Sequence, residues 1–153
     1  MKKYTNKRKK NFGAGRFDEM PSDNMADLNA SIKFDKKPYE ADIDASFCHA
    51  EMLANQNILK KNEVEKIKSG LLKIKDEIKN NKMTFKSELE DIHTHIETRL
   101  IKIIGPIGKK LHTARSRNDQ VSTATRIWAR EECGKVDSLL QKLQASLLKK
   151  SGK

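Results

Sequence analysis

The last third of the 153-residue sequence has the pattern of one long helix. From Asn118 or Asp119 to the end there is no proline, and Gly134 weakens the pattern by about 1 kcal/mol without breaking it. Roughly thirty residues at about 1.5 Å each reach about 50 Å, more than the width of a small globular domain. Apolar residues recur along it at helical spacing, at Val121, Trp128, Val136, Leu139, Leu143 and Leu147.

This apolar stripe needs partners along its whole length, and the few residues after Leu147 form no further helix that could supply them. We therefore expect the N-terminal part of a larger all-α protein, or burial of the stripe against other subunits. A solvated C-terminal helix is the alternative.

The rest of the chain is also expected to be helical. Glycine is absent between Arg16 and Ser69 and again between Leu71 and Ile104, which permits long helices there. Residues 31–37 are expected to be irregular, and residues 106–117 a loop. Apolar spacing and end signals predict helices over 23–30, 38–56, 62–79 and from the capping-box pattern at 87–90 to Gly105.

The positive charge is concentrated at the two ends of the chain. The net charge is +11, but nine of the 32 basic residues lie in residues 1–10 and 149–153, where there is no acid, so 23 remain against 21 acidic residues. We expect residues 1–16 to form a basic disordered tail, with an anchor to nucleic acid or to an anionic membrane as the alternative. Nucleic acid is an unlikely partner for the nearly neutral body.

With 36% hydrophobic residues and a mean hydropathy of -0.78, no stretch approaches a membrane span.

The cysteines and histidines give no sign of a metal site. Cys48 and Cys133 lie 85 residues apart with no CxxC spacing, which signals neither zinc nor a disulfide framework and fits a reducing cytoplasm. His93 and His95 are two residues apart and point to different sides of a helix, so each is interpreted as polar packing.

Residues 111–120 (LHTARSRNDQ) are the one segment that indicates chemistry. They combine two arginines, two hydroxyl groups and two amides with the start of the long helix. Exposed N–H groups, the positive end of the helix dipole and guanidinium groups together suit a carboxylate or phosphate ligand. The alternative is an Asn or Asp helix cap flanked by surface arginines. The residues alone therefore indicate an anion-binding loop and no particular reaction.

The same segment resembles the argininosuccinate lyase family of the fumarase/aspartase superfamily. Residues 112–121 match the family's most specific motif, His-Thr-(Gly/Ala)-Arg-Ser-Arg-Asn-Asp-Gln-Val. Shorter matches extend the likeness over nearly the whole chain, at 15–17, 29–35, 42–46, 90–93, 96–97 and 104–105.

The resemblance implies an all-α, fumarase/aspartase-like fold: a small N-terminal helical domain over 17–110, then a substrate-binding loop and the first long helix of a central bundle over 111–153. It also implies a cytoplasmic homotetramer that eliminates fumarate from argininosuccinate to give arginine, with no metal or organic cofactor. The chain would be the N-terminal portion of such an enzyme.

Carried over by motif, Ser31, Ser116, Arg117 and Asn118 resemble substrate contacts of the family. Arg115 and Asp35 are supporting candidates. His93 resembles a histidine close to the active site and is not assigned a catalytic role.

No catalytic residue is assigned, because the family motifs that bring the acid-base groups do not occur in these 153 residues. The resemblance implies that these groups lie beyond Lys153. We therefore expect the chain to be inactive alone. The alternative function is a non-catalytic helical interaction module, or a decayed remnant of the lyase.

Overall fold

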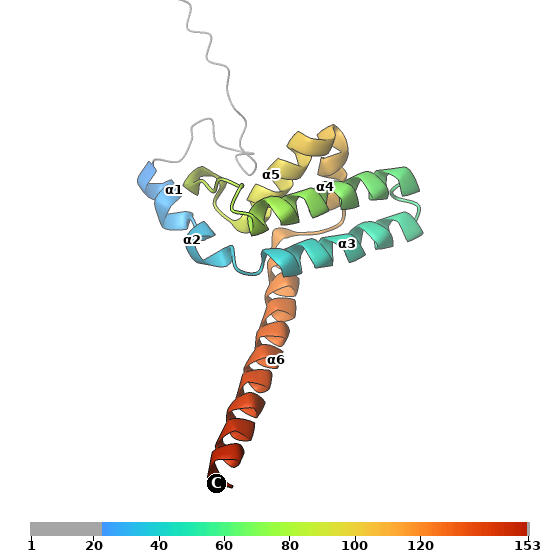
Figure 1. Cartoon of the computed structure of the whole chain (residues 1–153). Coiled ribbons are helices and arrows are strands. Elements are labelled where there is room, and N and C mark those ends of the chain that lie inside the picture. Colours follow the sequence, from blue (N-terminus) through green and yellow to red (C-terminus); the bar gives the residue numbers. More distant parts are fainter. Residues whose placement is uncertain (1–22, 153) are drawn as a thin grey trace, which may run out of the picture.

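A computed structural model describes residues 23–152, which form only helices and connecting turns (Figure 1). No strand occurs in this range, so the all-α prediction is confirmed. The elements are α1 (Asp23–Asn29), α2 (Ile32–Asp35), α3 (Tyr39–Asn55), α4 (Lys61–Lys79), the 3-10 helix η1 (Ser87–Leu89), α5 (Ile92–Ile104), the 3-10 helix η2 (Gly105–His112) and α6 (Arg117–Ser151).

Two of the sequence predictions concern residues outside this range. The basic tail predicted for residues 1–16 lies outside the described residues, and so does Lys153, beyond which the acid-base groups are expected. The structure therefore tests neither the tail nor the placement of those groups, and both stay predictions.

The core lies between α3, α4 and α5, with η2 packed against α5 (Figure 1). The apolar stripe predicted for residues 62–79 is the face of α4 that enters this core. Full burial of one such aliphatic side chain contributes about 2 kcal/mol, so this shared interior holds the three helices together. Its fully buried members include Ile43, Leu53, Ile67, Leu71, Ile74, Ile92 and Leu100.

Two features allow α4 and α5 to pack closely: a glycine on α4 and an ion pair between the two helices. A Cβ at Gly70 would lie 2.6 Å from Cδ1 of Leu100 and 3.1 Å from Cγ2 of Ile104, so a larger residue would force these side chains to move. Nearer the C-terminal end of α4, Nε and Nη2 of Arg99 each donate a 2.7 Å hydrogen bond to the carboxylate of Glu77. The pair lowers the pKa of Glu77 because these bonds favour its charged form.

The predicted start of the fourth helix is wrong. Ser87–Leu89 form the short η1 instead, and Glu90 turns the chain with φ 61° and ψ -67°. The N–H of Asp91 then donates to the carbonyl oxygen of Leu89 at 2.6 Å, which makes a γ-turn centred on Glu90. The cap of α5 is Asp91, whose carboxylate accepts from the Thr94 N–H at 2.6 Å. The predicted end at Gly105 is confirmed by its φ of 72°.

Two segments predicted to be irregular contain helical turns. Ile32–Asp35 form α2 within the range 31–37, and Gly105–His112 form η2, which begins one residue before the predicted loop and takes up its first part. Both turns bury an apolar side chain, Ile32 in the first and Leu111 in the second. Burial against the core therefore orders segments that carry no helical periodicity of their own.

The 35-residue α6 begins beside α3 and extends away from the other helices (Figure 1). Gln120 and Ala124 are its buried residues, and every described residue after Glu132 is exposed. The long helix predicted from the sequence is confirmed. Its distal leucines (Leu139, Leu140, Leu143, Leu147 and Leu148) are 52–72% exposed. Among residues 23–152, no helix combines the length and apolar character that crossing a membrane requires.

Candidate functional site

Two local features of the segment between η2 and α6 define where the long helix begins: a left-handed residue and a helix cap. Ala114 has φ 56°, a left-handed conformation that favours glycine and turns the chain toward α6. Ser116 then caps α6: its hydroxyl accepts from the Asp119 N–H, and its own N–H donates to the Asp119 carboxylate, both at 3.2 Å. The start of α6, with its positive dipole end, is thus held in one defined position.

Replacing Ser116 by alanine is expected to lower the free energy of unfolding by about 1 kcal/mol, because the Asp119 N–H loses its acceptor. Urea unfolding followed by circular dichroism measures this loss. Ser122→Ala is the matched control, since Ser122 is an exposed serine inside the same helix. Equal stability changes in the two variants would show that Ser116 does not act as the cap.

Arg117 fastens the start of α6 to the start of α5. Its Nε lies 3.4 Å from Oδ2 of Asp91, and its Nη2 lies 3.2 Å from Oγ1 of Thr94 and 3.3 Å from Oε2 of Glu97. Its Nη1 donates to the side-chain oxygen of Gln120 within α6. One guanidinium group therefore joins four side chains from two helices.

Ser31 lies on the loop between α1 and α2, and this loop is bound to the turn that precedes α5. The backbone N–H groups of Ser31 and Ile32 both donate to the carbonyl oxygen of Glu90, each at 3.0 Å. The Ser31 hydroxyl donates to the carboxylate of Asp35, whose other oxygen is buried without a partner. Because Glu90 adjoins Asp91, the Ser31 loop and the Arg117 side chain are bound to consecutive residues.

A buried polar network lies behind this surface, between α3, α5 and α6. The carboxylate of Asp42 is fully buried, and its Oδ1 accepts from Nε2 of Gln120 at 2.7 Å. Its Oδ2 lies 3.1 Å from Nδ1 of His93, out of hydrogen-bond alignment. One turn along α3, the Ser46 hydroxyl accepts from Nη1 of Arg115 at 3.1 Å. The network therefore sets the positions of two residues of the 111–120 segment.

Arg115 is a charged group in a desolvated position. Burial lowers the pKa of its guanidinium, and the neighbouring charge of Arg117 lowers it further, while Asp42 and Glu97 act in the opposite direction. Its Nε is buried without a hydrogen-bond partner. A cation held in this way gains from any additional anion that can approach it.

The six predicted site residues fall into two groups. Arg115, Ser116, Arg117 and Asn118 are consecutive at the start of α6, where Asn118 is exposed. Ser31 and Asp35 lie on the α1–α2 loop and on α2, and they reach the first group through Glu90 and Asp91. The arrangement places cations, hydroxyl groups and a helix N-terminus together, which suits an anionic ligand.

Three residues of this buried network were not identified from the sequence as site residues: Asp42, Ser46 and Gln120. The available signal was the presence of an acid and a hydroxyl four residues apart on the apolar face of α3, beside Ile43 and Ala50.

His93 is buried in this network. His95 is packed elsewhere, with Nε2 accepting from the Lys86 N–H at 2.9 Å and Nδ1 2.7 Å from the Asp91 carbonyl oxygen. Polar packing is therefore the role observed for His95.

Within residues 23–152, no three His, Cys, Asp or Glu side chains converge in an arrangement that could hold a metal ion. The junction formed by the Ser31 loop, the start of α5 and the start of α6 combines guanidinium and hydroxyl donors with the carboxylates of Asp91, Glu97 and Asp119.

Comparisons with known proteins single out one family. Residues 15–153 match the protein family described as Lyase. The argininosuccinate lyase of Bartonella bacilliformis is 48% identical over 134 residues, which are 88% of this chain and 29% of that protein. That of Ehrlichia chaffeensis is 48% identical over 134 residues, with 88% and 28% covered. That of Staphylococcus haemolyticus is 44% identical over 135 residues, with 88% and 29% covered. The chain thus spans less than a third of the length of these relatives.

Proposed function

The chain belongs to the lyase family, and we propose that it forms the substrate-binding N-terminal part of an argininosuccinate lyase. The reaction proposed for the whole protein is the elimination of fumarate from argininosuccinate to give arginine, in the cytoplasm. The domains proposed are a helical domain over 17–110 and a binding loop with the first bundle helix over 111–153.

The observation that supports this proposal best is the junction at the start of α6. There Arg117 binds Asp91, Thr94 and Glu97, and the Ser31 loop binds the adjoining Glu90. These contacts keep the residues proposed to bind substrate in fixed positions before any ligand arrives. A substrate rich in carboxylates needs such preorganised donors, because donors that are already oriented require no reorganisation during the reaction.

Within this junction we assign distinct parts to the candidate residues. Asn118 and Ser31 are proposed to contact substrate through side-chain hydrogen bonds. Arg115 and Arg117 supply positive charge, and Arg117 also fixes the loop through its carboxylate partners. Ser116 presents the first turn of α6, and Asp35 orients the Ser31 hydroxyl.

Proton transfer is proposed to come from segments beyond Lys153. The exposed leucines of α6 support assembly with further helices of the same kind of protein, in a homo-oligomer whose active site several subunits share. The same leucines favour the second candidate function, a helical interaction module without catalysis.

Complementation tests the proposal directly. The 153-residue chain is mixed with the Staphylococcus haemolyticus enzyme in which the residue aligned with Arg117 is changed to alanine, and fumarate formation is measured. We expect activity to return, because the intact chain lends its binding loop to the shared site. The Arg126→Ala variant of the chain is the matched control, since Arg126 is an exposed arginine of α6, and it should restore activity equally well.

The outcome separates the two candidate functions. Co-sedimentation of the two proteins without any fumarate formation would favour the interaction module. Folding of the chain without co-sedimentation or activity would contradict both functions. Fumarate formation by the chain alone would contradict the expectation that the acid-base groups lie beyond Lys153.

A further inference from the structure

A pocket of about 560 Å³ lies apart from the junction described above. It is formed by the end of α4, by residues 82–89 and by one side of α5. Its volume falls in the range typical of small-molecule sites. None of the six candidate substrate-binding residues belongs to its lining.

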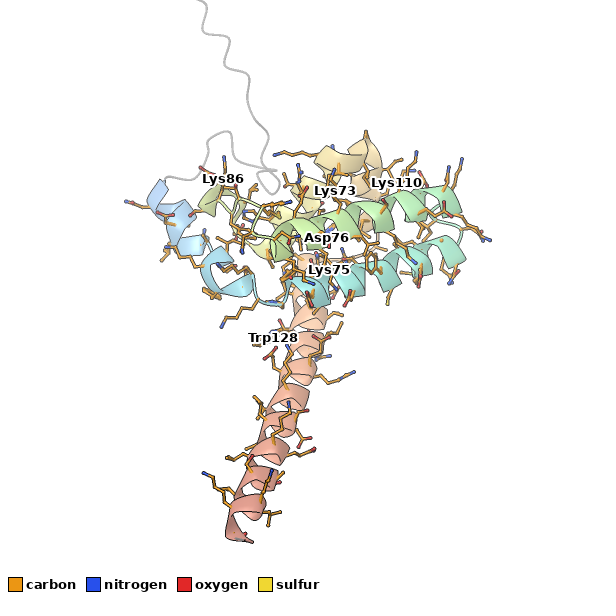
Figure 2. The ribbon with its side chains drawn as sticks, viewed as in Figure 1. Lys73, Lys75, Asp76, Lys86, Lys110 and Trp128 are labelled. Atoms are coloured by element: carbon orange, nitrogen blue, oxygen red, sulfur yellow. The ribbon has the colours of Figure 1, made fainter. Side chains whose placement is uncertain are left out.

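The charge of this pocket is unbalanced. Glu77 and Arg99 neutralise each other through their two hydrogen bonds. Lys82, Lys86 and Lys102 also line the pocket, and none of their ammonium groups forms a salt bridge with residues 23–152. Figure 2 shows Lys86 on the segment beside α4. Among the described lining residues Glu88 is the remaining acid, so the pocket carries a net positive charge.

The walls of the pocket are held in place even where the chain is irregular. The N–H of Lys86 donates to Nε2 of His95 at 2.9 Å, which fixes residues 82–86 against α5. The ring of Phe85 meets the His95 ring edge to face, with centroids 5.3 Å apart. These two contacts hold the backbone at residues 85 and 86 in place without a ligand, whereas the exposed side chains of Lys82, Lys86 and Lys102 become ordered on binding.

We propose that this pocket binds a small multivalent oxyanion, a phosphate or a polycarboxylate. The three lysines supply its counter-charge, and the hydroxyl groups of Thr84 and Thr98 supply neutral hydrogen bonds. The site is independent of the proposed lyase function, because it shares no lining residue with the junction.

Isothermal titration calorimetry of the 153-residue chain at fixed ionic strength tests this site. One arm of the experiment uses inorganic pyrophosphate and the other uses citrate, so that phosphate and carboxylate ligands are distinguished. We expect saturable binding of at least one of them. The triple variant Lys82→Ala, Lys86→Ala and Lys102→Ala should weaken it at least about tenfold, and added salt should weaken it further.

The matched control changes the same net charge outside the pocket. Lys33→Ala, Lys61→Ala and Lys66→Ala remove three exposed lysines that do not line it, and affinity should change by less than about twofold. Asn118→Ala should also leave the affinity unchanged, which separates this site from the junction. Absence of saturable binding by both anions, or equal weakening in both triple variants, would overturn the proposal.

Discussion

Replacing Asp42 by alanine should lower the free energy of unfolding by about 3 kcal/mol. The carboxylate is fully buried, so its removal leaves the Gln120 amide without its acceptor and Arg115 with Glu97 as its remaining nearby negative charge. Each buried group that loses its partner retains its desolvation cost. This loss is a large fraction of the stability of a small domain. Urea unfolding measured by circular dichroism gives its size.

Two further variants keep this prediction falsifiable. Asp42→Asn retains an acceptor for Gln120 and should cost about 1 kcal/mol, well below the alanine variant. Asp44→Ala is the matched control, because Asp44 lies on the same helix, its side chain is half exposed, and its carboxylate pairs with Lys75 at 3.4 Å. Its loss should stay below about 0.5 kcal/mol. An Asp42→Ala protein as stable as the Asp44→Ala protein would refute the role given to the buried network.

The Arg117→Ala chain is expected to restore at least about 100-fold less activity than the intact chain in the complementation assay. The variant removes positive charge from the junction and releases the loop from Asp91, Thr94 and Glu97. Because two carboxylates lose their partner, the free energy of unfolding should also fall by about 2 kcal/mol. Both losses are measured on the same preparation.

Lysine at this position separates charge from geometry. Arg117→Lys keeps the positive charge but lacks the planar group that reaches several partners at once, so it should recover part of the stability and little of the activity. If the Arg117→Ala chain restored as much activity as the Arg126→Ala control and the intact chain, the role proposed for Arg117 would be wrong.

The helices were predictable wherever apolar spacing and end signals agreed. The stripe from Val64 to Ile74 and the glycine stop at Gly105 are local features, and both occur as predicted. The start of α5 was not predictable in this way. Ser87 and Glu90 satisfy a capping-box pattern, but the backbone of Glu90 is held by N–H groups of Ser31 and Ile32, which lie far away in the sequence. A tertiary contact therefore overrides the local pattern.

In the candidate site too, the residues themselves were predictable from the local sequence, and the contacts that position them were not. Residues 115–118 stand out in the sequence because two arginines, a hydroxyl and an amide are adjacent there. The partners that position them come from other helices: Gln120 binds Asp42, 78 residues away in the chain, and Arg115 binds Ser46, 69 residues away. Pairings at such separations depend on how α3, α5 and α6 pack, which the spacing within one segment does not encode.

The helix α6 connects two different regions of the molecule: its first turns pack against the other helices, and its distal part carries the exposed leucines. Its first turns are bound by Arg117, Gln120 and Ala124, while the described residues beyond Glu132 stand free. This free portion, up to Ser151, is a stiff rod of about 28 Å, so a tilt of about 5 degrees at its base moves its tip by about 2.5 Å. Under the proposed function, a further helix that packs on the exposed leucines would also shift the first turns of α6, because the helix is stiff. We therefore expect a substitution at Leu143 to affect the proposed substrate binding at Asn118, which lies at the opposite end of α6.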